Sequence, residues 1–165
     1  FLMEDLESYG ATFKLSKKPV KISKDIMTTG EIEMTNDYES IDDRLYERKT
    51  GQMIPDRLAD DLALIVKTDE GLALITGCTH RGIINTVRHI QKLSGGEHIH
   101  TIIGGTHLHL SSLERIEKTA SELKKLGLQR LGVSHCTGFN ASMVLARRFR
   151  EVFFLNNSGT QVLLE

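Results

Sequence analysis

Apolar residues in the second half of the chain follow two spacings in turn, one typical of strands and one of helices. Two apolar runs, LALIVKT (62–68) and GLALITG (71–77), flank Asp69-Glu70-Gly71, which contains a hairpin turn signal. Over residues 83–93 the apolar side chains fall at helical spacing, and this pattern ends near Gly95-Gly96. The sequence therefore predicts two strands joined by a tight turn and followed by a helix.

The alternation continues to the end of the chain. IHTIIGG (99–105) predicts a strand, and SSLERIEKTASELKKLG (111–127) predicts a helix that begins with a capping box of Ser111 and Glu114. LQRLGVSH (128–135) predicts another strand, and Asn140 is expected to cap a short helix that ends at Phe149. VFFL (152–155) and TQVLLE (160–165) predict two closing strands. Strands that alternate with helices predict a layered α/β fold.

The first third of the chain gives weaker signals. Leu2, Leu6 and Tyr9 lie at helical spacing before Gly10, so a helix is already in progress where the sequence starts, and we expect the chain to be part of something longer. Residues 11–16 and 19–22 predict extended segments, and residues 26–34 predict a strand. The polar stretch 36–60 has few apolar residues, which predicts a lid or a flexible excursion.

Length and composition narrow the class of protein. With 165 residues, 39% of them hydrophobic, residues 1–165 fit a single domain with a substantial core. The 21 basic and 22 acidic residues nearly balance, which argues against a nucleic-acid binder. The two cysteines form neither a disulfide framework nor a C-x-x-C zinc motif. With no apolar run of membrane-spanning length and no signal peptide, we expect a cytoplasmic protein.

Three of the predicted strands run into small residues and then a histidine. These are His80 after LALITGCT, His107 after HTIIGGT and His135 after LQRLGVS, which lie 27 and 28 residues apart. In open α/β sheets ligands bind at the carboxyl ends of strands, so the three imidazoles are expected to meet there. Imidazole is the commonest metal ligand near neutral pH, and three such groups suit zinc, iron, cobalt or nickel.

Other residues near these histidines allow alternatives. His109 is two residues beyond His107 and is an alternative ligand. Cys78 and Cys136 flank the cluster, either as thiolate ligands or as small apolar side chains at strand ends. Thr137 and Gly138 lead into a predicted helix, whose first N–H groups would suit a phosphate or a carboxylate.

Several motifs together resemble a known family. DDLALIVKTDEGLALITGCTHRGIINTV, IIGGTHLH, VSHCTG and TGEIE (29–33) are similar to the C-terminal half of the metallo-β-lactamase-fold subfamily named for the dihydropterin-phosphate synthase of methanopterin biosynthesis. The resemblance implies part of an αβ/βα sandwich with one or two metal ions at one edge. It implies that His80 and His135 are metal ligands, and that His107 stands where many relatives have a bridging aspartate.

This sequence also differs from the family pattern at two places. The H-x-H-x-D-H motif that supplies the other ligands in this fold is absent, and Arg81 stands where relatives have a small residue. The first hypothesis is a metal-dependent hydrolase or phosphate-ester enzyme, incomplete as given, with zinc as the expected ion and manganese or iron as alternatives. It acts on a small phosphorylated substrate held by Thr137, Gly138 and Arg81. The second is a non-catalytic domain that binds a phosphate- or pterin-like molecule, with Arg81 and the lysines near Pro19 as anion ligands.

Overall fold

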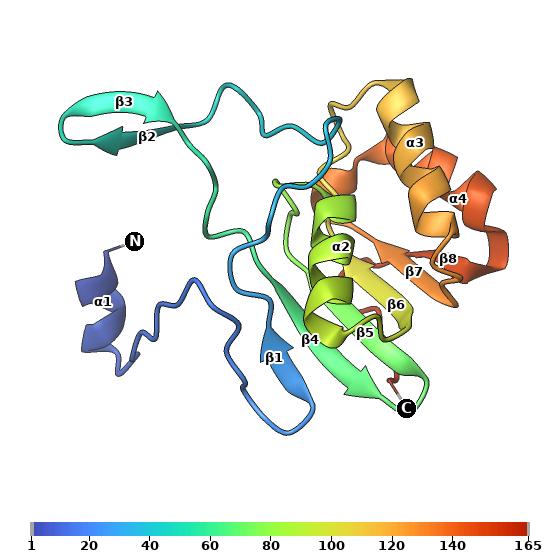
Figure 1. The fold of residues 1–165 in the computed structure, drawn as a ribbon, viewed down its shortest axis with the longest axis horizontal. Coiled ribbons are helices and arrows are strands. Elements are labelled where there is room, and N and C mark those ends of the chain that lie inside the picture. Colours follow the sequence, from blue (N-terminus) through green and yellow to red (C-terminus); the bar gives the residue numbers. More distant parts are fainter. Residues whose placement is uncertain (1, 165) are drawn as a thin grey trace.

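A computed structural model describes residues 2–164 and confirms the mixed α/β class (Figure 1). The main sheet has six strands in the order β1-β4-β5-β6-β7-β8. Strands β1, β4 and β5 pair antiparallel, whereas β5, β6, β7 and β8 pair parallel. Their bounds are Ile26–Thr28 (β1), Ala63–Thr68 (β4), Gly71–Thr76 (β5), Ile99–Gly104 (β6), Arg130–Val133 (β7) and Phe153–Leu155 (β8).

Three helices pack against one face of this sheet, as Figure 1 shows. These are α2 (Ile83–Ser94), α3 (Leu113–Lys124) and α4 (Phe139–Phe149), whereas helix α1 (Met3–Ser8) lies apart from the sheet. Two short 3-10 turns, η1 (His135–Thr137) and η2 (Arg150–Val152), flank α4. Within residues 2–164, no helix combines the length and the apolar character needed to cross a membrane.

The core lies between the sheet and the helices α2, α3 and α4. Leu74, Ile102 and Leu131 are register neighbours on β5, β6 and β7, and all three are almost completely buried against the helices. Each such side chain contributes about 1.5–3 kcal/mol when it leaves water. Because successive strand residues point to opposite faces, Ile75 and Ile103 face the other way, and Ile75 stays 38% exposed.

Some predicted elements differ from those observed. Helix α3 is capped by Ser112 rather than Ser111, because Ser112 has the extended backbone of a cap and its hydroxyl accepts the Arg115 N–H. Gly138, rather than Asn140, precedes α4. Residues 11–16 and 160–164 form no strand, and β1 is shorter than the predicted 26–34. The expected hairpin of β4 and β5 is present.

The stretch 36–60 divides into two parts. Glu39 is only 2% exposed, and its carboxylate accepts the backbone N–H groups of Ile84 (2.9 Å) and Asn85 (2.8 Å) at the start of α2. The Asn85 side chain in turn accepts hydrogen bonds from Thr35 and Asn36. Only strands β2 (Tyr46–Lys49) and β3 (Gln52–Pro55) extend away from the body, as a hairpin (Figure 1).

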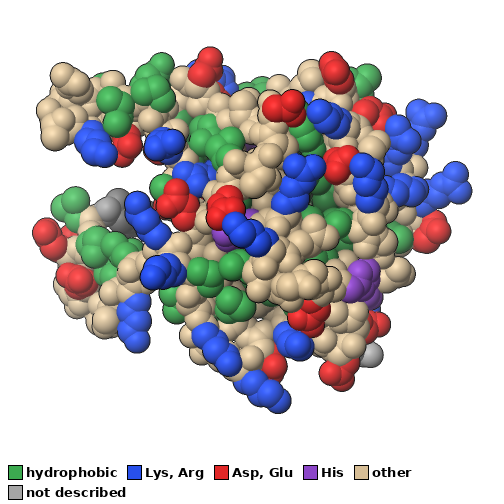
Figure 2. Space-filling view, viewed as in Figure 1, with side chains coloured by type: hydrophobic (Ala, Val, Ile, Leu, Met, Phe, Trp, Pro, Cys, Tyr) green, Lys and Arg blue, Asp and Glu red, His purple; other side chains and the backbone are tan. Residues whose placement is uncertain are grey.

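The histidine of α2 also ties down the segment before Asn36. His89 is buried, and its Nε2 lies 3.1 Å from the Thr29 carbonyl oxygen. Basic and acidic side chains intermingle over the face of the molecule seen in Figure 2, in keeping with the balanced charge of the sequence.

Candidate functional site

The predicted site residues lie in three loops at one edge of the sheet. Strands β5, β6 and β7 are parallel, and Thr76, Gly104 and Val133 align in register at their carboxyl ends. The loops that follow carry His80, His107 and His135. Backbone hydrogen bonds join them, from Gly105 N–H to the Gly77 carbonyl (2.9 Å) and from His109 N–H to the Cys136 carbonyl (3.2 Å). Side chains far apart in sequence are therefore brought to one edge.

His80 and His107 lie side by side. Their ring centroids are 4.0 Å apart with an interplanar angle of 39°, and the His109 ring lies edge-on to His107 at 5.2 Å. The Nδ1 atoms of His80 and His107 are both buried and have no hydrogen-bond partner within the described residues. A buried polar atom without a partner costs about 1–3 kcal/mol, so the pair would gain from a cation or a polar ligand.

His107 is neutral at pH 7. Burial and then the neighbouring His80, His109 and Arg115 side chains lower its pKa to about 4, although the Asp42 carboxylate acts in the opposite direction. A neutral imidazole has one nitrogen lone pair free, which is the form that binds metal ions.

His135 lies with the two cysteines. Cys78, His135 and Cys136 each have one possible metal-binding atom, and these three atoms lie within 4.8 Å of one another. His80 and His107 are not part of this group. The Cys136 thiol donates to the Cys78 carbonyl oxygen at 3.4 Å, and burial raises its pKa to about 11. The cysteines, which the sequence left open as ligands or apolar side chains, thus lie within the cluster.

Backbone strain marks all three loops. Thr79, His107 and His135 have φ angles of 54°, 48° and 50°, in the left-handed region that residues other than glycine seldom occupy. Such residues cost of order 1–3 kcal/mol each and concentrate at functional sites, where the surrounding structure holds them. Hydrogen bonds provide that hold here: the Thr79 hydroxyl donates to the Gly105 carbonyl at 3.2 Å.

The predicted substrate-binding residues have partners inside the protein. Thr137 is fully buried, and its hydroxyl accepts a hydrogen bond from the Thr106 hydroxyl at 3.0 Å. The Arg81 guanidinium donates to the carbonyl oxygens of Arg57 and Ile32 and is 3.0 Å from Glu31. These contacts give Arg81 a structural role, and substrate binding by Thr137, Gly138 and Arg81 stays a prediction.

Gly138 allows the third loop to pass close to the second. Its φ is 72°, and a Cβ atom at this position would lie 2.6 Å from the Cβ of His109. Glycine is therefore required both for the backbone angle and for the close approach to His109.

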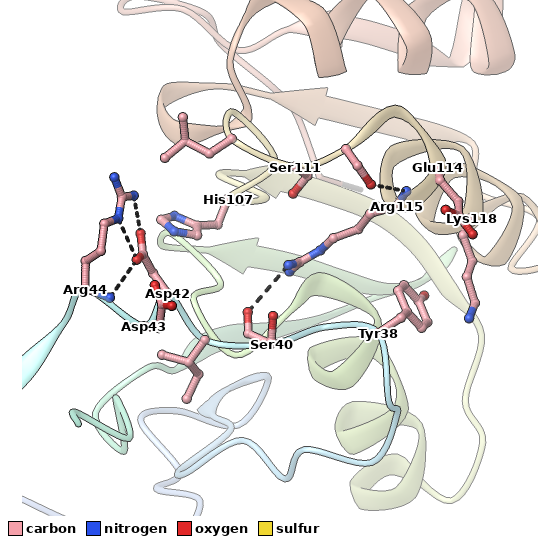
Figure 3. A pocket seen from close by; sticks show the side chains of 13 residues that line it. Tyr38, Ser40, Asp42, Asp43, Arg44, His107, Ser111, Glu114, Arg115 and Lys118 are labelled. Carbon is pink, nitrogen blue, oxygen red and sulfur yellow. Dashed lines mark hydrogen bonds and ion pairs between the residues drawn. The ribbon is translucent and has the colours of Figure 1, made fainter. Parts of the chain in front are cut away.

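A cavity of about 870 Å³ opens beside His107, between the 38–44 segment and the start of α3 (Figure 3). Arg115 extends across the cavity toward Ser40, and the Arg115 Nη1 donates to the Ser40 carbonyl oxygen at 3.5 Å. The Arg115 Nε is buried and has no partner among the described residues. At the His107 end, Arg44 pairs with Asp42 and holds the pKa of that carboxyl well below its usual range. The cavity is therefore lined by acidic and by basic side chains.

Sequence reasoning missed several of these residues. Arg115 and Tyr38 line the cavity, yet the polar 36–60 stretch carries no periodicity that could place it against α3. Asp61 was also missed: burial raises its pKa, and it accepts the N–H of Arg81, the residue after His80, at 2.8 Å. The cysteines had a usable signal, since each lies within two residues of a strand-end histidine.

The chain resembles known proteins in sequence and in fold. No family model matches the chain. The chain is 37% identical over 164 residues to 7,8-dihydropterin-6-methyl-4-(beta-D-ribofuranosyl)-aminobenzene-5'-phosphate synthase of Methanocaldococcus jannaschii, covering 96% of the chain and 55% of that protein. It is also 37% identical over 94 residues to an uncharacterized protein of the same organism, covering 55% of the chain and 34% of that protein.

A solved structure matches as well. The crystal structure of a metal-dependent hydrolase of the β-lactamase superfamily superposes with a TM-score of 0.82 and 29% identity, covering 93% of this chain and 59% of the other. The chain thus spans little more than half the length of the synthase and of this hydrolase. It resembles the dihydropterin-phosphate synthase in sequence and a hydrolase of the β-lactamase superfamily in fold, which supports the subfamily that its motifs suggested.

Proposed function

We propose that the chain is part of a metal-dependent enzyme that hydrolyses or transforms a small phosphate ester. The observation that carries the proposal is the His80–His107 pair, with rings 4.0 Å apart and both buried Nδ1 atoms without a partner in the described residues. The names of the matched synthase and hydrolase support a phosphorylated compound and a divalent metal. We further propose a cytoplasmic location, where cysteines such as the unpaired Cys78 and Cys136 stay reduced.

The residues present fit a divalent ion. The neutral His107, the adjacent His80 and the strand-end His135 supply nitrogen donors for one or two ions, with zinc as the first choice and manganese or iron as alternatives. A bound ion would polarise the ester and lower the pKa of water.

The cavity next to His107 suits a small anionic substrate. Its carboxylates are compensated or exposed, because Asp42 pairs with Arg44 while Asp43 and Glu114 face solvent. Arg115 is half-buried, and among the described residues its guanidinium donates to the Ser40 carbonyl oxygen at 3.5 Å while its Nε has no partner. The Ser111 hydroxyl and the Lys118 ammonium line the same cavity. Together with Arg115 they would donate hydrogen bonds to a phosphate group that lies next to His107.

Metal content tests the proposal directly. The reduced chain is equilibrated with zinc, manganese or iron, dialysed, and its bound metal counted by mass spectrometry. We expect bound zinc in the native chain and in the His98→Ala variant, whose histidine is exposed, and fewer bound ions per chain in the His80→Ala/His107→Ala double variant. If the native chain binds none of these ions, the enzyme proposal is wrong, and the alternative of a metal-free binding domain is favoured.

Phosphate-ester turnover distinguishes the two functions further. The chain is assayed on simple phosphate mono- and diesters with the best-bound metal, and the Arg115→Ala variant is expected to raise KM. Because this sequence lacks the H-x-H-x-D-H motif, turnover is expected to be low, and phosphate binding that none of the three metals changes would support the binding-domain alternative instead.

A further inference from the structure

We propose that Cys78, His135 and Cys136 bind a thiophilic divalent ion of the zinc class, at a position distinct from the His80–His107 pair. The inference rests on the metal chemistry of the proposed function and deepens it, because it assigns different donors to two ions. Three donor atoms within 4.8 Å of one another can enclose one ion after small side-chain rotations. Because this group shares no residue with the His80–His107 pair, the two sites can be tested separately.

The packing of the loops brings the two thiols together. Cys78 follows β5 and Cys136 follows β7, so the loop after β6 runs between them. Residue 105 in that loop is glycine, and a Cβ atom there would lie 2.8 Å from the Cys136 Sγ and 3.3 Å from the Cys78 Cα. The missing side chain is what allows Cys136 to reach the Cys78 carbonyl oxygen at 3.4 Å.

The chemistry of the donors selects the ion. Two thiolates and one imidazole suit zinc, whereas magnesium, calcium and manganese prefer oxygen. On binding, each cysteine releases its thiol proton and forms a metal–sulfur bond, so two protons leave for each ion bound. His135 is exposed whereas the cysteines are half-buried, so a fourth coordination position would face solvent. Its left-handed φ of 50° fits a residue held in place for a ligand.

Cobalt spectroscopy tests the donor set. The chain, reduced with a phosphine and kept without oxygen, is titrated with Co²⁺ while the thiolate-to-cobalt charge-transfer absorption is followed in the near ultraviolet. We expect this band in the native chain, in the His80→Ala/His107→Ala variant and in the His98→Ala control. We expect Cys78→Ser and Cys136→Ser each to lose about half of the band, the double variant to lose all of it, and each single variant to weaken Co²⁺ binding at least about tenfold, equal to about 1.4 kcal/mol.

The outcomes separate this inference from the proposed function. Cobalt that binds without the band, and is lost with His80 and His107, would overturn the inference and leave the proposed function standing. A band of unchanged intensity in Cys78→Ser would also overturn it. Should the serine variants unfold, alkylation of the native chain decides instead: zinc must protect both cysteines from iodoacetamide, and alkylation unchanged by zinc refutes the site.

Discussion

The carboxylate of Glu39 should be a large single contributor to stability. It accepts two N–H groups at the start of α2 and the Asn36 side-chain amide at 2.7 Å, in a position that is 2% exposed. In Glu39→Ala two backbone donors lose their acceptor, at about 1–3 kcal/mol each where water cannot replace it. The favourable contact of a negative charge with the helix N-terminus, about 0.3–1 kcal/mol, is lost as well. We expect the free energy of unfolding to fall by about 2–4 kcal/mol.

Urea unfolding at pH 7, followed by circular dichroism, measures this loss. The midpoint should fall with little change in slope, because the same surface is exposed on unfolding. Glu39→Gln keeps one acceptor oxygen and should lose only about 1–2 kcal/mol. The control Glu114→Ala removes an exposed acid from the first turn of α3 and should cost less than about 1 kcal/mol. A loss below about 1 kcal/mol in Glu39→Ala would refute the reasoning.

Three further predictions follow from the structure. Burial and then the neighbouring Glu39 raise the pKa of Tyr38 to about 12, so in a 295 nm titration one of the three tyrosines should ionise late. Because the unfolded chain loses this proton near pH 10, stability should fall between about pH 10 and pH 12, and Tyr38→Phe should abolish both effects. Gly105→Ala would place a Cβ 2.6 Å from the Gly77 carbonyl oxygen and should cost about 1–3 kcal/mol in urea unfolding. The control Gly77→Ala meets no atom within 4 Å and should change stability by less than about 0.5 kcal/mol. In limited trypsin digestion, the first cuts should fall in the 46–55 hairpin, because strands β2 and β3 contact mainly each other and not the body of the protein. First cuts within 63–155 would contradict this.

The strongly periodic half of the chain was predictable, and the rest was not. Strands β4 to β7 and helices α2 and α3 follow from local patterns, because one buried face dictates the spacing of apolar residues. The cap of α3 moved by one residue because both Ser111 and Ser112 have the required side chain, and only the backbone angles choose between them. The place of Glu39 was invisible, since nothing near residue 39 signals a partner 45 residues further along.

The site was predictable in its location but not in its grouping. Parallel strands bring their carboxyl ends to one edge, so the convergence of the three histidine loops follows from the strand pattern. The grouping of His135 with Cys78 and Cys136 depends on left-handed backbone angles and on Gly105, which has no side chain between the two loops. Such angles have no signature in the sequence for residues other than glycine.

The segment anchored by Glu39 continues directly into the wall of the cavity, through Ser40 and Asp42. The equilibrium that opens this segment from α2 therefore also dismantles the cavity. In a hydrogen-exchange experiment, the backbone amides held at the start of α2, those of Ile84 and Asn85, should exchange in a single cooperative unit with the wall. A molecule that fills the cavity should slow this whole unit by one common factor, even at amides it never touches.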